Sequence, residues 1–328
     1  MPMMSRRRFI AVSAAAAGCA FASTLGAAGS PEPVTWRGWA LGAEASLTIH
    51  HPDRAVAERL VRRVVAEVER LEQIFSLYRP DSTLSQLNRA GALAAPPSDL
   101  VAVLEASGRV WKASNGAFDP TVQPLWKLLA EHFSQEKPDP AGPSPDQLRQ
   151  AVALVGFDKL AFDRDHVVFT RRGMGLTLNG IAQGYITDRA VDILRHGGIE
   201  KSMVDMGEIS ALGTRPDKRP WRVGIANLAA GEEEMAMLEL EDQAVATSAA
   251  DGFLFEPEGR FNHLIDPRTG LGAARYSSVT VIAPEATTAD AFATAFSLMT
   301  REAVAKVLTS ETGLQAQLVD PNGVRVLL

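Results

Sequence analysis

Two side chains with oxygen ligands stand four residues apart near the end of the chain. In the stretch 288–294, TADAFAT, Asp290 supplies a carboxylate and Thr294 a hydroxyl. Residues four apart lie on one face of a helix, and such oxygens are ligands for hard cations such as Mg²⁺. The pair indicates part of a magnesium site, although on an alanine-rich helix it is more often only a polar edge.

A titratable side chain lies upstream, in the stretch 263–270, HLIDPRTG. His263 changes its charge near neutral pH and can act as a general base. Asp266 begins an Asp-Pro turn and is the alternative base, with His263 orienting it; its side-chain oxygen can instead cap the turn. A metal site together with a base indicates phosphoryl chemistry.

The composition is that of a globular protein and limits its partners. The chain has 328 residues, 46% of them hydrophobic, which is enough for a large core. Its formal charge is −6, or −9 without the N-terminal Arg6, Arg7 and Arg8, and runs of Lys or Arg are lacking in the rest of the chain. This predicts no binding to nucleic acid. The lack of a Gly-x-Gly-x-x-Gly motif after a predicted strand argues against a nicotinamide-dependent dehydrogenase.

The N-terminus has the features of an export signal, so the sequence predicts a leader over residues 1–30 and one domain over 31–328. Arg6 and Arg7 precede a weakly apolar stretch rich in Ala, Gly and Ser. This is typical of a twin-arginine signal and predicts a periplasmic protein. Cys19, the only cysteine, follows AAG in a pattern similar to a lipoprotein cleavage box. A lipid anchor at Cys19 is therefore the alternative to a soluble product, and an intrachain disulfide is impossible.

Apolar residues spaced by three and four predict four helices, and short β-branched runs predict strands between them. The helices are expected over residues 55–78, 100–114, 180–197 and 288–300, and the strands over 45–49, 167–169, 221–225 and 278–282. The proline-rich stretch 137–145 is expected to be a surface loop. This order predicts an α+β fold in one unit with two lobes, rather than a doubly wound parallel sheet.

Seven segments in sequence order resemble the signatures of the ApbE family of FAD:protein FMN transferases. Each is weak alone, but the order of all seven makes the resemblance specific. They are FSLYRPDSTLSQLN (75–88), GAFDPTVQPL (116–125), LNGIAQGY (178–185), VDMGEI (204–209), ATS (246–248), HLIDPRTG (263–270) and TADAFAT (288–294). The resemblance implies a single two-lobed α+β domain with mixed or antiparallel sheets and packed helices.

The resemblance also implies a reaction and a set of site residues. The reaction is Mg²⁺-dependent transfer of FMN from FAD to a Thr or Ser hydroxyl of an acceptor flavoprotein, with AMP as the leaving group. By resemblance, Mg²⁺ is held by Asp290, Thr294 and the backbone carbonyl of Gly180, and His263 matches the catalytic base. Family contacts to FAD match Leu41, Tyr78, Ala117, Phe118, Asp119, Thr177, Gln183 and Ile265.

Three positions depart from the family pattern. Thr177 stands where the family commonly has aspartate, and Gln183 where it commonly has lysine or glutamate, so nucleotide affinity or specificity is expected to differ. Met206 replaces a usual glycine and is expected to narrow the approach to the backbone there. The leader and the variant DMGEI resemble the NosX subgroup, which implies an acceptor similar to NosR, a membrane protein of nitrous oxide respiration.

Two other functions are compatible with the same residues. Water could hydrolyse FAD to FMN and AMP at the same metal site, as in an FAD pyrophosphatase. Alternatively, the protein could be an exported FAD carrier without catalytic activity. The presence of Asp290, Thr294 and His263 counts against the carrier.

Overall fold

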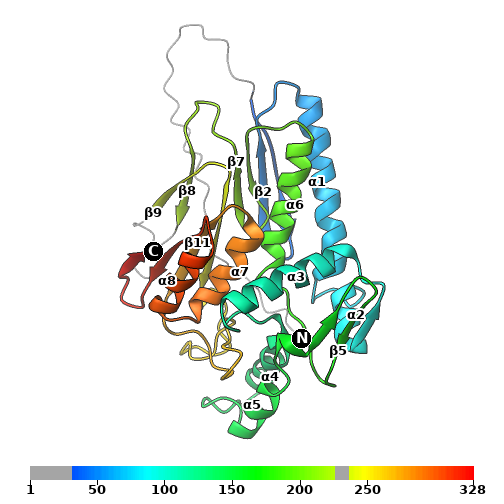
Figure 1. Cartoon of the computed structure of the whole chain (residues 1–328), viewed down its shortest axis with the longest axis vertical. Helices are drawn as coiled ribbons and strands as arrows, with labels where there is room; N and C mark the ends of the chain where they lie inside the picture. Colours follow the sequence, from blue (N-terminus) through cyan, green and yellow to red (C-terminus); the bar gives the residue numbers. More distant parts are fainter. Residues whose placement is uncertain (1–31, 226–235) are drawn as a thin grey trace.

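An antiparallel sheet of eight strands lies at the centre of the molecule, in the order β1-β2-β6-β7-β10-β11-β12-β13 (Figure 1). The computed structural model describes residues 32–225 and 236–328. Every strand ladder within these residues is antiparallel, so the sheets are antiparallel rather than mixed. The strands of the large sheet are Val34–Ala40, Ala43–Ile49, Ser202–Asp205, Ile209–Leu212, Gln243–Ala249, Ser278–Ala283, Gln315–Val319 and Arg325–Leu327.

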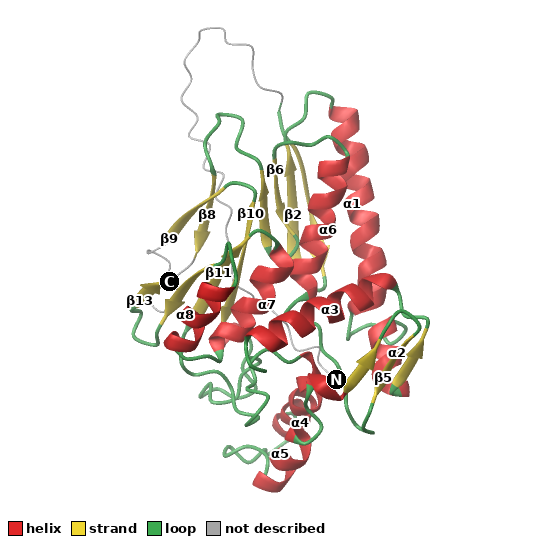
Figure 2. Ribbon diagram, viewed as in Figure 1, coloured by secondary structure: helices red, strands yellow, loops and turns green. Residues whose placement is uncertain are grey.

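Helices cover one face of the large sheet and a two-stranded hairpin covers part of the other (Figure 2). The helices are α1 (Arg54–Phe75), α3 (Ser98–Ala113), α6 (Ala182–His196), α7 (Ala286–Ser297) and α8 (Arg301–Ser310). The hairpin consists of β8 (Trp221–Ile225) and β9 (Ala236–Leu240), whose Trp221, Val223 and Leu240 form a second core with residues of β6, β7 and β10. Strands β6 and β7 are therefore covered on both faces.

A smaller lobe is built on α4 (Gln123–Phe133) and α5 (Pro145–Val152), which lie at the lower end of the view in Figures 1 and 2. These helices share a separate core with the loop 253–272, in which Leu125, Leu129 and Ile265 are buried. The other elements are α2 (Thr83–Ala90), a small sheet of β3 (Ala92–Ala94), β5 (His166–Phe169) and β4 (Leu160–Phe162), and short 3₁₀ turns at Pro120–Val122, Phe157–Lys159 and Ala250–Gly252.

The α+β fold, the four helices and the four strands predicted from the sequence are confirmed, with changes at their ends. Helix α1 ends at Phe75 rather than near residue 78: the Ser76 backbone is extended (φ −69°, ψ 128°), and its carbonyl accepts a hydrogen bond from the Ser82 hydroxyl at 2.5 Å. The stretch 137–145 is a loop up to residue 144, and Pro145 begins α5, where a proline loses no helical hydrogen bond.

The leader lies outside the described residues, as do Arg6, Arg7 and Cys19. Within residues 32–225 and 236–328, no helix has both the length and the apolar character needed to cross a membrane.

Candidate active site

Helices α6 and α7 run antiparallel and touch through a glycine. A Cβ atom on Gly184 would lie 2.3 Å from the carbonyl oxygen of Ala286, so only glycine permits this approach of the two backbones. The Gly184 N–H donates to Oδ2 of Asp290 at 3.1 Å. Asp290 on α7 is thus held against the first turn of α6.

The same antiparallel register brings Gly180 close to Thr294. Gly180 lies four residues before Gly184, and Thr294 lies four residues after Asp290. A Cβ atom on Gly180 would lie 2.8 Å from the Thr294 hydroxyl oxygen. The three residues predicted to hold Mg²⁺ therefore meet: Asp290 and Thr294 come from α7, and Gly180 comes from the turn before α6.

The charge state of Asp290 suits a cation. The side chain is buried, and this burial raises its pKa to about 7; the negative charge of Asp188 adds to the effect, and the Gly184 hydrogen bond opposes it. Among the described residues, Asp290 has no cationic partner and the Thr294 hydroxyl has no hydrogen-bond partner. A buried carboxylate without a counter-ion, next to an available hydroxyl, is a donor set that fits a hard divalent cation.

Two further buried carboxylates lie at the tight connection between β6 and β7, within the segment 204–209: Glu208 interacts with Asp290, and Asp205 interacts with Glu208. Burial raises the pKa of Asp205 to about 6. Burial also raises the pKa of Glu208 well above its ordinary value, and the charges of Asp290 and Asp205 act in the same direction. A backbone hydrogen bond from Thr247, in the segment 246–248, opposes this shift. No role was predicted for these two carboxylates from the sequence, yet the negative charge of Glu208 would favour a cation at Asp290.

Among the described residues, His263 has a hydrogen-bond partner for one ring nitrogen and none for the other. Its Nδ1 lies 3.3 Å from the carbonyl oxygen of Phe253, and a carbonyl can only accept, so Nδ1 carries the proton and Nε2 keeps its lone pair. Burial lowers the pKa of His263 below its ordinary 6.5, although the Phe253 hydrogen bond and the charge of Asp251 oppose this. A neutral imidazole with a free Nε2 is suited to accept a proton near neutral pH.

The Asp266 carboxylate accepts hydrogen bonds within its own turn. Its Oδ1 accepts from the Arg268 N–H and Nε, and its Oδ2 accepts from Nη2, each at 2.9 Å. Burial would raise the pKa of Asp266, but the hydrogen bonds from Arg268 outweigh it and hold this pKa below its ordinary value. The carboxylate caps the Asp-Pro turn, one of the two alternatives left by the sequence, and is a weaker base than His263.

Two of the seven segments are hydrogen-bonded to the backbone at Leu176 and Thr177, just before the segment 178–185; Thr177 is one of the positions predicted to contact FAD. The Asn88 side chain exchanges two hydrogen bonds with the Leu176 backbone, at 2.8 and 2.7 Å. The Thr177 N–H donates to the carbonyl of Pro120 at 2.8 Å. The segments 75–88 and 116–125 are thereby joined to the stretch of chain that leads into α6.

The predicted FAD contacts at 117–119 have side chains that belong to the fold. Ala117 and Phe118 are in the main core, and Phe118 is only 4% exposed. Asp119 accepts from the Thr121 N–H at 2.8 Å and from the Phe157 N–H at 2.9 Å. Phe118 is therefore a core aromatic, and a nucleotide at this segment would meet mainly its backbone.

The remaining predicted FAD contacts are spread over both lobes. Leu41 lies in the turn between β1 and β2 and donates its N–H to Glu72 at 2.6 Å, while the Tyr78 ring is 51% exposed just after α1. The Gln183 side chain lies against Gly207, where a Cβ atom would be 2.5 Å from its amide nitrogen. Ile265 is buried in the core of the smaller lobe.

The contacts of the described residues do not join His263 directly to Asp290 and Thr294. His263 belongs to the loop packed on the smaller lobe, whereas the other two lie on α7 against the large sheet. Met206, expected to narrow the backbone approach, is fully buried in the main core, so its side chain is accommodated by packing.

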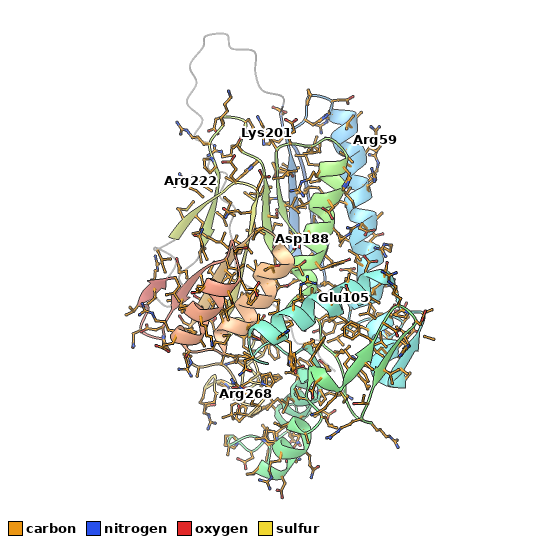
Figure 3. The ribbon with its side chains drawn as sticks, viewed as in Figure 1. Arg59, Glu105, Asp188, Lys201, Arg222 and Arg268 are labelled. Atoms are coloured by element: carbon orange, nitrogen blue, oxygen red, sulfur yellow. The ribbon has the colours of Figure 1, made fainter. Side chains whose placement is uncertain are left out.

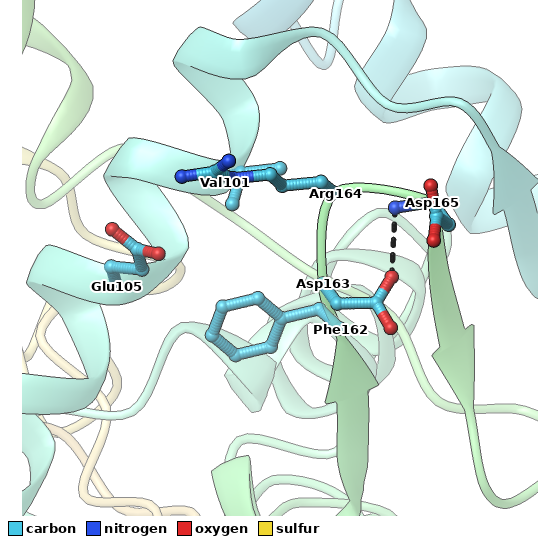
Figure 4. Close-up of a pocket in the computed structure, with 6 residues that line it drawn as sticks. All are labelled: Val101, Glu105, Phe162, Asp163, Arg164 and Asp165. Carbon is cyan, nitrogen blue, oxygen red and sulfur yellow. Dashed lines mark hydrogen bonds between the residues drawn. The ribbon is translucent and has the colours of Figure 1, made fainter.

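A cavity of about 460 Å³ lies away from these residues, between α3 and the β4–β5 connection (Figure 4). Its lining consists of Val101, Glu105, Phe162, Asp163, Arg164 and Asp165. No predicted site residue contributes to it, so the geometry of α6 and α7 locates the chemistry and this cavity does not.

We expect Gly184→Ala to destabilise the protein by about 3 kcal/mol, because the new methyl group would overlap the Ala286 carbonyl. Thermal unfolding would measure the loss. Gly175→Ala is the matched control, since its Cβ would meet only ordinary contacts, the nearest at 3.4 Å. Equal stability of the two variants would contradict the close approach of α6 and α7.

The family model described as "ApbE family" matches residues 41–318. The chain belongs to the ApbE family. It is 32% identical over 294 residues to the FAD:protein FMN transferase of Vibrio cholerae, covering 86% of this chain and 87% of that protein. It is 31% identical over 252 residues to the FAD:protein FMN transferase of Haemophilus influenzae, covering 73% and 72%. The solved flavin transferase ApbE from Vibrio cholerae superposes with a TM-score of 0.79 at 27% identity, covering 90% and 96%.

The matched ApbE range contains all seven segments and every predicted site residue, from Leu41 to Thr294. The resemblance read from the motifs is thereby confirmed at the level of the ApbE family.

Proposed function

We propose that this protein is a Mg²⁺-dependent FAD:protein FMN transferase that modifies a Thr or Ser hydroxyl of an acceptor protein. The observation that carries the proposal is the meeting of Asp290, Thr294 and Gly180 across α6 and α7. Membership of a family whose relatives are FAD:protein FMN transferases supports it.

The residues divide the chemistry between them. Asp290, Thr294 and the Gly180 carbonyl would hold Mg²⁺, which when bound supplies positive charge to the pyrophosphate of FAD. His263 accepts the proton of the acceptor hydroxyl at Nε2 as the oxygen attacks the phosphorus on the FMN side. The bond from that phosphorus to the bridging oxygen breaks, and AMP leaves.

The activity should persist to lower pH than an ordinary histidine would allow. His263 acts as a base only when neutral, so activity falls as the pH drops through its pKa, and burial places that pKa below 6.5. The midpoint of the acid limb of kcat/KM, measured at saturating Mg²⁺, is expected below 6.5. A midpoint above 7 would show that another group controls the acid limb.

The decisive experiment incubates the purified mature protein with FAD, Mg²⁺ and a candidate acceptor domain, followed by intact-mass analysis. A gain in acceptor mass equal to the FMN group, with release of AMP, supports transfer. Free FMN and AMP with an unmodified acceptor would indicate an FAD pyrophosphatase. Unchanged FAD bound to the protein would indicate a carrier.

We also propose that the protein works in the periplasm, on a membrane flavoprotein similar to NosR. The twin arginines and the DMGEI variant of the segment 204–209 support this. Replacing Arg6 and Arg7 with lysine should retain the precursor in the cytoplasm, because the export receptor reads the arginine pair. Cell fractionation with an antibody to the mature region tests it, and unchanged periplasmic product would contradict it. Loss of membrane association in Cys19→Ala would identify the lipid-anchored alternative.

A further inference from the structure

Helix α7 begins without a cap of its own. Its N-cap residue is Glu285, whose side chain makes no capping hydrogen bond. Instead, Asp188 on α6 accepts from the Ala286 N–H at 2.7 Å and from the Thr287 N–H at 2.8 Å. The Thr287 hydroxyl also donates to this carboxylate. Figure 3 labels Asp188 where α6 lies against α7. A neighbouring helix thus supplies the cap that the first turn of α7 needs.

The capping contact lies one helical turn from the proposed metal ligands. Ala286 precedes Asp290 by four residues, and Asp188 follows Gly184 by four, so both contacts belong to the same antiparallel register. Each helix supplies a carboxylate to the first turn of the other. Asp188 of α6 accepts from backbone N–H groups at the start of α7, and Asp290 of α7 accepts from a backbone N–H at the start of α6. The first turn of α7 is thereby tied to α6, and a helix transmits that position to its next turn.

Most of the acceptor capacity of the Asp188 carboxylate is already used. Its two oxygens accept from two backbone N–H groups and one hydroxyl, all on α7. Such an acceptor has little capacity left to ligate a metal directly. Asp188 would therefore influence the metal by fixing the position of α7, which carries two of the proposed ligands.

We propose that Asp188 is a positioning residue that sets the affinity for Mg²⁺, by fixing where Asp290 and Thr294 stand relative to the Gly180 carbonyl. The inference rests on the proposed function, in which these three groups hold the metal. Without the cap, the first turn of α7 loses its hydrogen bonds to α6. Asp290 and Thr294 are then no longer held in position opposite the Gly180 carbonyl. Partners that orient metal ligands typically change metal affinity by 10- to 100-fold when removed.

The test uses Asp188→Asn. Asparagine has nearly the size of aspartate, but its side-chain NH₂ group would face one of the two backbone N–H groups that Asp188 accepts from, so one hydrogen bond would be lost. Mg²⁺ binding would be measured by calorimetry without FAD, and transfer would be measured as a function of Mg²⁺ concentration. We expect the dissociation constant and the half-saturating Mg²⁺ concentration to rise about tenfold. The rate at saturating Mg²⁺ should stay within about twofold of the parent. Asp192→Asn, four residues further along α6 and paired with Arg189, is the control and should bind as the parent does.

A second substitution separates capping from direct ligation. Glu285 is exposed and has the extended backbone of an N-cap (φ −127°, ψ 141°), so Glu285→Ser would give α7 a cap within its own chain segment. Adding it to Asp188→Asn should restore most of the lost Mg²⁺ affinity. Failure of this rescue, with the fold intact, would make Asp188 a direct ligand and overturn the proposal. Unchanged Mg²⁺ affinity in Asp188→Asn would overturn it as well.

Asp188→Asn could fail to fold, and the parent protein could fail to bind Mg²⁺; each outcome has its own consequence. If Asp188→Asn fails to fold, Thr287→Val removes only the hydroxyl contact and should raise the dissociation constant about threefold; no change would overturn the proposal. If the parent protein itself does not bind Mg²⁺, the proposed function loses its metal and the positioning role falls with it. That result differs from a parent that binds Mg²⁺ and a variant that binds equally well.

Discussion

Replacing Asp290 with asparagine is expected to slow FMN transfer about a thousandfold while stabilising the protein in the absence of metal. The loss of activity corresponds to about 4 kcal/mol, the scale on which a bound metal stabilises transition-state charge. The gain in stability has a separate origin, because a buried carboxylate without a counter-ion is costly to ionise. A residue kept for function and not for the fold should show this combination.

The stability effect has a defined pH window. Burial raises the pKa of Asp290 from 3.8 to about 7, so the folded state holds a proton that the unfolded state releases. Relative to the variant, the parent should lose stability as the pH rises from about 4 to about 7 and show a constant deficit above that. Thermal unfolding in EDTA at several pH values measures this.

The matched control for Asp290 is Asp146→Asn, an exposed carboxylate on α5 whose removal should change neither quantity. Full transfer activity of Asp290→Asn, or of the parent protein in EDTA, would remove the metal from the mechanism.

His263→Ala should bind FAD nearly as tightly as the parent but transfer FMN about a hundredfold more slowly, the lower end expected for loss of a general base. The reason is that Nε2 acts only when the acceptor hydroxyl attacks. Flavin titration and single-turnover transfer on one preparation separate the two quantities.

Two other variants serve as comparisons for His263→Ala. His166→Ala removes an exposed histidine paired with Asp163 and should have no effect on transfer. Asp266→Asn should weaken the turn held by Arg268 and reduce transfer less than His263→Ala does. Equal loss of FAD binding and turnover in His263→Ala would make His263 a contact or structural residue, and Asp266 would become the preferred base.

The helices were predictable from apolar residues spaced by three and four, which α1 and α6 bury on one face while α7 is buried on nearly all sides, whereas several central strands were not. The prediction for residues 180–197 corresponds to α6, and that for 288–300 corresponds to α7 within three residues. Strands β6 and β7 were missed because they are buried on both faces, by helices on one side and by β8 and β9 on the other. Such strands lack the alternation of polar and apolar residues that marks a half-buried strand.

The pairing of the proposed metal ligands was predictable in part. The four-residue spacing of Asp290 and Thr294 follows from helix geometry, but the partner Gly180 came only from the family resemblance. Asp188 was missed, because a capping carboxylate supplied by a distant helix leaves no local pattern. The one available signal is indirect: Glu285 is a poor residue for the start of a helix, which indicates that α7 obtains its cap elsewhere.

The contact between Gly184 and Asp290 spans 106 residues of sequence, and this has a consequence for the order of events during synthesis. Contacts between distant segments form only after both have left the ribosome, and they are slow to form because a long loop must close first. A nascent chain that has not yet made α7 has only Gly180 of the three proposed metal ligands, and Asp188 has no first turn of α7 to cap. Cofactor loading must therefore wait until the chain is nearly complete, and truncation before residue 286 should leave a protein that cannot load metal at all.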